Sequence, residues 1–170
     1  ACMSKAHIHI IKMGGTIEFI DPAYDAVNKK LMKLDATIES YLSNLIQPHF
    51  NFSVEKVTEK DSREITDDDR QKLADAIEAT PHQNIIVTHG TFTMRDTAQF
   101  LDSKGFSDKK IILTGSMIPI TGFSISDAGF NLGFSVASFP GVEPGVYLSM
   151  NGGIFHFADV EKNVELFRFE

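Results

Sequence analysis

Short apolar runs alternate along the chain with longer segments whose apolar residues recur at helical spacing. The isoleucine-rich run from His7 to Lys12 stops at two glycines, which predicts a buried strand that ends in a sharp turn. Three further runs have the same strand character, and Asn151-Gly152-Gly153 adds a hairpin signal after the last of them. They extend from Asn84 to Thr88, from Lys110 to Leu113 and from Gly145 to Met150.

Helical periodicity fills the intervals between these runs. It predicts helices over 34–46, 66–79, 95–101 and 126–138, and apolar alternation over 50–57 predicts one more strand. The segment from Asp159 to Glu170 is polar, and we assign no element to it. Strands that alternate with helices predict an α/β fold with a mainly parallel sheet and helices on both faces.

Composition narrows the class of protein. The 170 residues fit a single domain, residues 1–170, and a net charge of -7 argues against a nucleic-acid partner. No apolar segment is long enough to span a membrane, and we see no signal peptide, so we expect a cytoplasmic protein. Cys2 is the one cysteine, which excludes an internal disulfide and a cysteine metal cluster.

Three predicted strands end with a glycine that is directly followed by a hydroxyl residue. These pairs are Gly15-Thr16, Gly90-Thr91 and Gly115-Ser116. The carboxyl ends of parallel strands lie at one edge of a sheet, so we expect the three hydroxyls to converge, with Ser62 nearby. A hydroxyl beside an amine suits attack on a carbonyl carbon, and backbone N–H groups at glycine turns can stabilise the resulting oxyanion.

Two of these strand ends resemble the signature motifs of bacterial-type L-asparaginases. Met13-Gly14-Gly15-Thr16-Ile17 is similar to the family's Thr-Gly-Gly-Thr-Ile, and His89-Gly90-Thr91-Phe92-Thr93-Met94 is similar to its His-Gly-Thr-Asp-Thr-Met. The similarity covers nearly the whole chain. It implies a flavodoxin-like fold of the asparaginase N-terminal domain type. Ordinary asparaginases have a second, C-terminal domain, so the resemblance is to short, single-domain asparaginase-like proteins.

The resemblance implies a catalytic role for four residues. Thr16 matches the threonine nucleophile that attacks the side-chain amide, and Thr91 matches the second active-site threonine. Lys162 corresponds to the lysine that assists the second threonine. Tyr24 lies in the segment that brings a tyrosine to the nucleophile in the family, although its spacing differs.

Substrate contacts are implied for five further positions. Ser62 matches the serine that binds the substrate α-carboxylate, and Ser116 lies where the family's backbone contacts the leaving amide. Gly15 and Gly90 belong to the two motifs. Phe92 stands where the family has the aspartate that contacts the α-ammonium group, and a phenyl ring cannot supply that negative charge. Asp61, Glu64 and Asp159 are acidic residues that could replace it.

Three functions stay open at this point. The first is hydrolysis of a small carboxamide, such as asparagine, to an acid and ammonia, without a metal or cofactor and in a homodimer or homotetramer. The second is a catalytically degenerate relative that binds a small ligand or a protein partner, which Phe92 favours. A nucleotide-binding module is the third, but Gly14-Gly15 lacks the Gly-x-Gly-x-x-Gly spacing. His7 and His9 alternate with isoleucines, which indicates hydrogen-bonded strand histidines rather than metal ligands.

Overall fold

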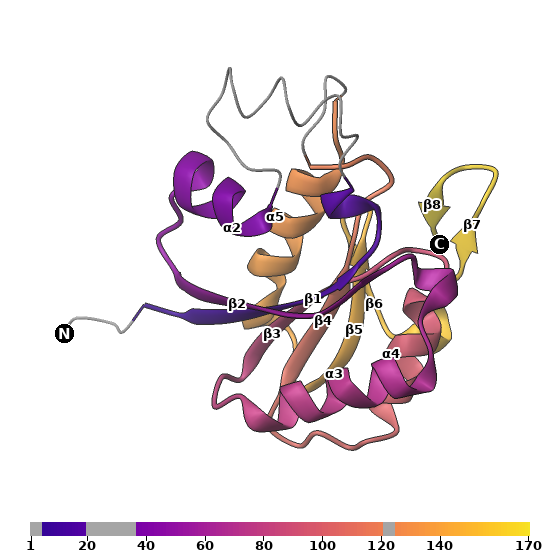
Figure 1. Cartoon of the computed structure of the whole chain (residues 1–170), viewed down its shortest axis with the longest axis horizontal. Coiled ribbons are helices and arrows are strands. Elements are labelled where there is room, and N and C mark those ends of the chain that lie inside the picture. The colour runs from indigo at the N-terminus through magenta and orange to yellow at the C-terminus, as the bar shows by residue number, and fades with distance from the viewer. Residues whose placement is uncertain (1–4, 20–36, 121–124) are drawn as a thin grey trace.

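The computed structural model describes residues 5–19, 37–120 and 125–170. These residues form a six-stranded sheet with the order β2-β1-β3-β4-β5-β6 (Figure 1). Its strands are β1 (His7–Gly14), β2 (Asn51–Lys60), β3 (Asn84–Thr88), β4 (Lys110–Thr114), β5 (Gly145–Met150) and β6 (Gly153–Phe155). The first five strands are parallel, and β6 pairs antiparallel with β5. The predicted α/β fold with a mainly parallel sheet is confirmed.

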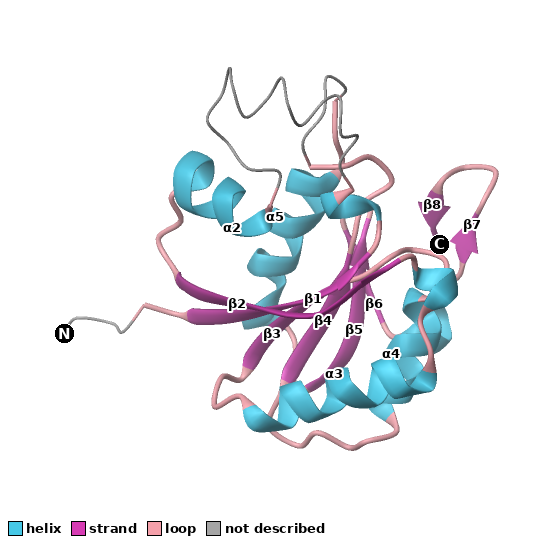
Figure 2. Cartoon of the chain, viewed as in Figure 1, coloured by secondary structure: helices cyan, strands magenta, loops and turns pink. Residues whose placement is uncertain are grey.

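Helices cover both faces of the sheet (Figure 2). They are α2 (Ile38–Ser40), α3 (Asp67–Ala79), α4 (Met94–Asp102) and α5 (Ala128–Ser138). α2 and α5 lie on one face, and α3 and α4 lie on the other. Since successive strand side chains point to opposite faces, Ile10 joins the core beneath α2 and α5, whereas Ile11 joins the core beneath α3 and α4.

Two of the predicted elements differ in detail from the structure. The predicted strand over 50–57 continues to Lys60, because β2 stays paired with β1 as far as Gly14. The predicted helix over 34–46 begins outside the described residues, and its described part is one α-helical turn followed by a π-helical segment, Tyr41–Ile46. The helix predicted over 66–79 begins at a capping box between Thr66 and Asp69, and its first turn is acidic.

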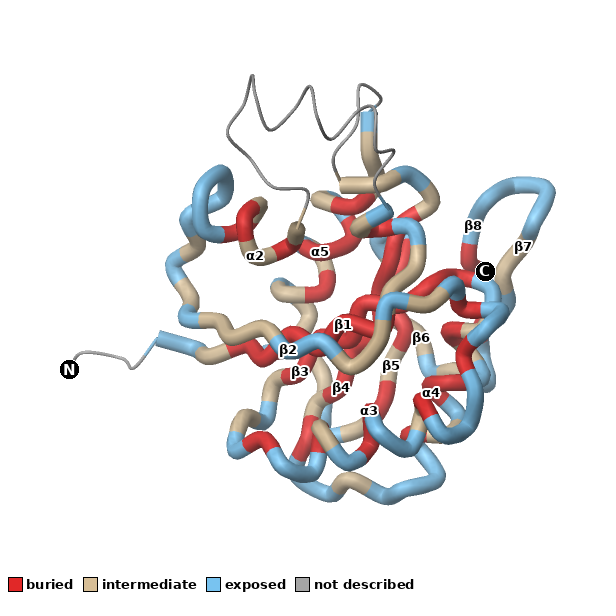
Figure 3. Tube along the Cα trace, in the orientation of Figure 1, coloured by how far each residue is buried: buried red, intermediate tan, exposed pale blue. Residues whose placement is uncertain are grey.

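The polar C-terminal segment forms an element that the hydrophobic pattern missed. β7 (Lys162–Asn163) and β8 (Arg168–Phe169) make a small antiparallel hairpin outside the main sheet. Phe169 is only 3% exposed and belongs to the core beneath α4, and its backbone N–H donates to Asn151 Oδ1 at 2.9 Å. One buried aromatic side chain therefore anchors a hairpin that is otherwise largely exposed (Figure 3).

The strand order indicates at which edge of the sheet a ligand would bind. After β1 the chain continues to β2 on one side, and it then crosses to β3 on the other side of β1. The carboxyl ends of β1 and β3 therefore flank a topological switch point, where open parallel sheets bind their ligands. Thr16 lies two positions after the end of β1, and Thr91 lies three positions after the end of β3.

Candidate active site

The turn after β1 requires glycine at two successive positions. Gly14 and Gly15 have φ angles of 102° and 87°, in the region that side chains other than glycine rarely adopt. A Cβ atom on Gly14 would collide with the Lys60 carbonyl, and one on Gly15 would collide with the backbone of Gly90. The two glycine turns are therefore packed backbone to backbone, which brings the residue after each of them, Thr16 and Thr91, to the same edge of the sheet.

Thr91 is hydrogen-bonded to the amine of a lysine near the C-terminal end of the sequence. Lys162 Nζ donates to Thr91 Oγ1 at 2.7 Å, although the two residues are far apart in sequence. Thr91 is 8% exposed. Burial lowers the pKa of Lys162, and the nearby Arg63 guanidinium lowers it further. The lowered pKa makes it easier for the ammonium to lose a proton, and the neutral amine that results can accept a proton from the hydroxyl.

The β7–β8 hairpin determines the position of that amine. Lys162 lies directly opposite Phe169 in the hairpin register, and Phe169 is fixed in the core. Glu161 and Glu170 exchange two backbone hydrogen bonds, which close the hairpin at its open end. The β7–β8 hairpin, which is separate from the main sheet, thus holds Lys162 close to Thr91.

Ser62 connects the end of β2 with the Thr91 loop. Its hydroxyl accepts a hydrogen bond from the backbone N–H of Phe92 at 3.2 Å, and its carbonyl accepts one from Thr93 Oγ1 at 2.5 Å. Ser62 is 2% exposed, and a Cβ atom on Gly90 would collide with its side chain. Ser62, Thr91 and Lys162 therefore lie in one connected group.

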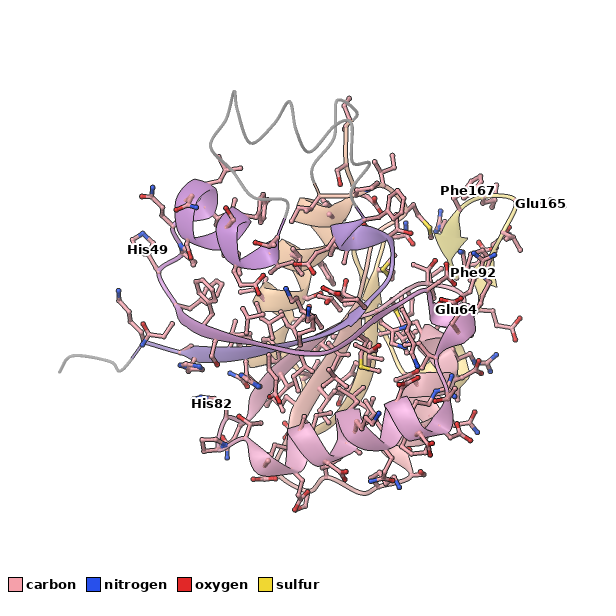
Figure 4. The ribbon with its side chains drawn as sticks, viewed as in Figure 1. His49, Glu64, His82, Phe92, Glu165 and Phe167 are labelled. Atoms are coloured by element: carbon pink, nitrogen blue, oxygen red, sulfur yellow. The ribbon has the colours of Figure 1, made fainter. Side chains whose placement is uncertain are left out.

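Phe92 is an exposed aromatic side chain whose ring is contacted by two cationic side chains. Lys162 Nζ lies 3.8 Å from its ring centroid, and Arg63 Cζ lies 4.9 Å from it. The side chain of Phe92 is on the same end of the molecule as Phe167 of the β7–β8 loop (Figure 4). Asp61, a possible replacement for the family's aspartate, is bound by Arg63 through two side-chain hydrogen bonds of 2.9 and 3.0 Å.

His89 supports the strand end from below. Its Nδ1 is 2.7 Å from the Gly90 carbonyl, and its Nε2 is 2.8 Å from Thr97 Oγ1, which in turn accepts from Arg70 Nε. The ring is completely buried, and this burial lowers its pKa to about 4. His89 is therefore a neutral structural residue that fixes the loop between β3 and α4.

A buried ion network lies beneath the Thr16 turn. Lys12 Nζ donates to Glu18 Oε1 at 3.2 Å and to Glu39 Oε1 at 2.8 Å. Glu18 also accepts from the backbone N–H of Ile38 at 2.7 Å, and burial raises its pKa. Lys12, Glu18 and both glycines contribute to the lining of a cavity of about 260 Å³. The network ties the 3-10 helix Thr16–Glu18 to α2.

Ser116 is buried at the end of β4, but its hydroxyl is used locally. It donates to the carbonyl of Ile118 at 2.7 Å, within its own turn. Asp127 accepts from the backbone N–H groups of Met117 and Ile118, and Asn131 donates to the Gly115 carbonyl. The start of α5 therefore holds this strand end, and no contact joins the Ser116 hydroxyl to the other site residues that the structure describes.

The structure thus unites some of the predicted site residues and leaves others apart. It links Ser62, Thr91, Phe92 and Lys162 through direct contacts, and it packs Gly15 on Gly90. Thr16 is exposed beside them, and its side chain has no hydrogen-bond partner within the described residues. Tyr24 lies outside the described residues.

Arg63, Lys12 and Glu18 are contributors that the sequence interpretation missed. A charged residue inside an isoleucine-rich strand was the available signal for Lys12, because a buried lysine needs anionic partners.

The described residues contain neither a metal-binding cluster nor a membrane-spanning helix. Within residues 5–19, 37–120 and 125–170, no three His, Cys, Asp or Glu side chains are arranged to hold a metal ion. His7 and His9 both contact Ser53 Oγ, at 2.9 and 2.7 Å, as hydrogen-bonded strand histidines do. None of the helices in these ranges has the length and apolar character that crossing a bilayer requires.

Comparison with known proteins agrees with the resemblance of the motifs. A "Probable L-asparaginase periplasmic" from Haemophilus influenzae is 32% identical over 168 residues, which are 92% of this chain and 46% of that protein. A "Glutaminase-asparaginase" from Acinetobacter glutaminasificans is 38% identical over 112 residues, or 62% of this chain and 34% of the relative. The chain spans about half the length, or less, of these relatives.

Solved structures give the same result for the fold. The crystal structure of L-asparaginase I from Vibrio cholerae superimposes with a TM-score of 0.81 at 26% identity, over 98% of this chain and 51% of that one. The family profile "Asparaginase, N-terminal" matches residues 7–165. The chain therefore belongs to the asparaginase family, in the region that the profile of its N-terminal domain covers.

Proposed function

We propose that the protein is an asparaginase-like amidohydrolase, which hydrolyses a small carboxamide to an acid and ammonia. The observation that carries this proposal is the 2.7 Å hydrogen bond between Lys162 Nζ and Thr91 Oγ1. A buried hydroxyl paired with an amine of lowered pKa is a proton-transfer unit. It lies across the Gly15–Gly90 contact from Thr16, an exposed hydroxyl without a competing hydrogen bond among the described residues.

In the proposed reaction, Thr16 Oγ attacks the amide carbon and transfers its proton to a base, for which Tyr24 is our candidate. The tetrahedral intermediate collapses, the C–N bond breaks, and ammonia leaves with a proton, which produces an acyl ester on Thr16. Water then attacks the ester while Thr91, paired with Lys162, takes a proton from it. The acid is released and the Thr16 hydroxyl is restored.

The remaining polar groups have proposed roles in binding. Backbone N–H groups at the two glycine turns, including those of Gly15 and Gly90, are candidates for stabilising the oxyanion. The Ser62 hydroxyl is our candidate for a substrate carboxylate, since its oxygen accepts from Phe92 N–H and it donates its own proton to no acceptor within residues 5–19, 37–120 and 125–170. Ser116, whose hydroxyl is bonded to Ile118, would contribute through its backbone.

Phe92 favours a second function, namely binding of a ligand or partner without turnover. In the motif resemblance Phe92 stands at the position of the family's aspartate, and its side chain is 55% exposed. A ligand-binding relative would retain the Ser62–Phe92 and Lys162–Phe92 contacts and would not need the Thr16 hydroxyl.

Ammonia release separates the two functions. The purified protein is incubated with asparagine, glutamine and simple amides, alongside the variants Thr16→Ala and Thr16→Ser. Amidohydrolase function predicts ammonia above the background of Thr16→Ala, with partial activity in Thr16→Ser, which retains a hydroxyl. Ammonia at the Thr16→Ala level for every amide would reject the hydrolase and favour the binding protein.

We further propose that the chain assembles as a homodimer or homotetramer. Ile125 and Phe130 are 94% and 63% exposed and line a hollow of about 640 Å³ together with Arg168. Contiguous exposed apolar patches mark interfaces, and these two side chains are our candidate for such a patch. Sedimentation velocity over a range of concentrations tests this proposal, and a monomer at all concentrations would reject it.

A further inference from the structure

The charge near Thr91 is opposite in sign to that of the whole protein. The chain has a net charge of -7, yet the ring of Phe92 is contacted by the ammonium of Lys162 and the guanidinium of Arg63. An aromatic face attracts cations through its quadrupole, but it carries no net charge and cannot neutralise them. Two positive charges are therefore gathered beside the Thr91 hydroxyl.

Neighbouring carboxylates neutralise these cations only in part. Asp61 accepts two side-chain hydrogen bonds from Arg63, which is otherwise exposed to solvent. Lys162 forms no ion pair with any carboxylate in the described ranges, and its partners there are the Thr91 hydroxyl and the Phe92 ring. Its neighbour Glu161 is paired with Arg95 instead. Glu64 also interacts electrostatically with Arg63, so the positive charge that no carboxylate of the described residues offsets is that of Lys162.

This arrangement of side chains discriminates between ligands by charge. A ligand carboxylate near Phe92 would meet two cations and the Ser62 hydroxyl, which has a proton to donate. A ligand ammonium in the same place would meet two like charges, and the acidic neighbours there, Asp61 and Glu64, both interact with Arg63. The charge of Arg63 persists at every pH at which proteins are assayed, because guanidinium does not deprotonate in that range.

We propose that this site selects anionic monoamides of dicarboxylic acids without an ammonium group, with Arg63 and Phe92 as the specificity-determining residues. Succinamate represents this class, and its hydrolysis consumes one water and yields succinate and ammonium. The identity of the reacting group rests on the amidohydrolase function proposed above. The charge preference follows independently from the arrangement of Arg63, Phe92 and Lys162.

Three amides of similar size test the preference, because they differ mainly in charge: succinamate is an anion, asparagine a zwitterion and β-alaninamide a cation. We expect kcat/KM, measured by ammonia release at neutral pH, to be about tenfold or more higher for succinamate than for asparagine, and lowest for β-alaninamide. Asparagine hydrolysed as efficiently as succinamate would overturn the charge preference and leave the amidohydrolase function in place.

Variants assign the preference to the two residues. Arg63→Gln is expected to reduce the ratio of succinamate to asparagine, and Phe92→Asp to reverse it by placing a carboxylate between the two cations. Phe92→Leu, which adds no charge, should retain a preference for the anion. Lys104→Gln is the matched control, because it removes a cation 4.5 Å from the ring of Phe100, on α4, and should leave the ratio unchanged. An unchanged ratio in Phe92→Asp would overturn the assignment.

A binding measurement separates failure of this inference from failure of the proposed function. The three amides are titrated by calorimetry into Thr16→Ala, which lacks the proposed nucleophile. If the parent protein releases ammonia neither from these three amides nor from glutamine, the amidohydrolase function is rejected and the titration decides the charge preference alone. Tighter binding of succinamate supports the preference, whereas equal binding, tighter asparagine or no binding overturns it.

Discussion

Lys162 Nζ and Thr91 Oγ1 are 2.7 Å apart, although 71 positions separate the two residues in the sequence. The contact joins a hairpin outside the main sheet to the loop at the end of a central strand. Burial and the charge of Arg63 both disfavour the protonated amine and lower its pKa. This pair is the part of the site whose chemistry is most directly open to measurement.

Removal of the Lys162 amine should abolish most amide turnover. A positioned proton-transfer group typically contributes about 10²- to 10⁴-fold to a rate, so Lys162→Met is expected to lower kcat by roughly that factor. In the parent, kcat should rise with pH as the amine becomes neutral, with a midpoint below the ordinary lysine value of 10.5.

Arg63→Gln provides the matched test of this pH dependence. Loss of the neighbouring positive charge should raise the pKa of Lys162, so the midpoint of the kcat profile should move to higher pH. A profile that is identical in the parent and in Arg63→Gln would contradict the coupling of the two cations.

Gly15→Ala should destabilise the fold and damage the site together. Gly15 has a φ of 87°, and a Cβ atom there would collide with the backbone of Gly90. Strain in this region alone costs about 1–3 kcal/mol, which urea unfolding can measure. Gly133→Ala is the control, because a Cβ atom on Gly133 of α5 meets open space, and it should raise stability by up to about 1 kcal/mol. Equal stability of the two variants would contradict the close approach of the two turns.

Lys12→Met should reduce stability more at neutral than at acidic pH. The side chain of Lys12 is only 8% exposed and that of Glu18 17%, and removal of one partner from a buried pair typically costs about 3 kcal/mol. Lys12 holds down the pKa of Glu18, which burial raises, so the variant's Glu18 should have a still higher folded-state pKa.

The sign of this pH effect follows from linkage. A carboxyl whose folded-state pKa exceeds its unfolded value of 4.5 favours folding only while it is protonated, and this contribution disappears as pH rises through the folded pKa. The stability deficit of Lys12→Met, measured by urea unfolding, should therefore shrink as pH falls toward that folded pKa. The double variant with Glu18→Gln should recover part of the deficit at neutral pH. A deficit that is independent of pH would argue against an unpaired Glu18 carboxylate.

Neutral His89 should contribute an acid-sensitive component of stability. Its folded-state pKa of about 4 lies below the unfolded value of 6.5, so the unfolded chain binds the additional proton in between. Stability from this group is complete above pH 6.5 and declines as pH falls toward 4, by about 3 kcal/mol in total. His89→Gln should reduce the slope of the unfolding free energy against pH in the acid range, by the amount that corresponds to one bound proton. An acid limb of unchanged slope would show that another group causes the acid sensitivity.

Local sequence was sufficient to predict most of the fold. Isoleucine-rich runs such as the one that begins at His7 form buried strands because each residue packs against a neighbouring strand or a covering helix. The start of α3 near residue 66 was predictable because its capping box, between Thr66 and Asp69, is a contact between residues three positions apart. The hairpin that carries Lys162 escaped prediction because one distant core contact, made by Phe169, stabilises it.

Some features of the candidate site were likewise predictable from local sequence, and others depend on tertiary contacts. The sequence by itself determined where the glycine turns lie and that Thr16 and Thr91 follow them, because a turn's backbone conformation depends on its own residues. Only the tertiary structure decided that Lys162 reaches Thr91, that Phe92 lies against two cations, and that Ser116 uses its hydroxyl locally. These contacts join segments far apart in the chain, and their distances depend on how the sheet, α5 and the C-terminal hairpin pack together.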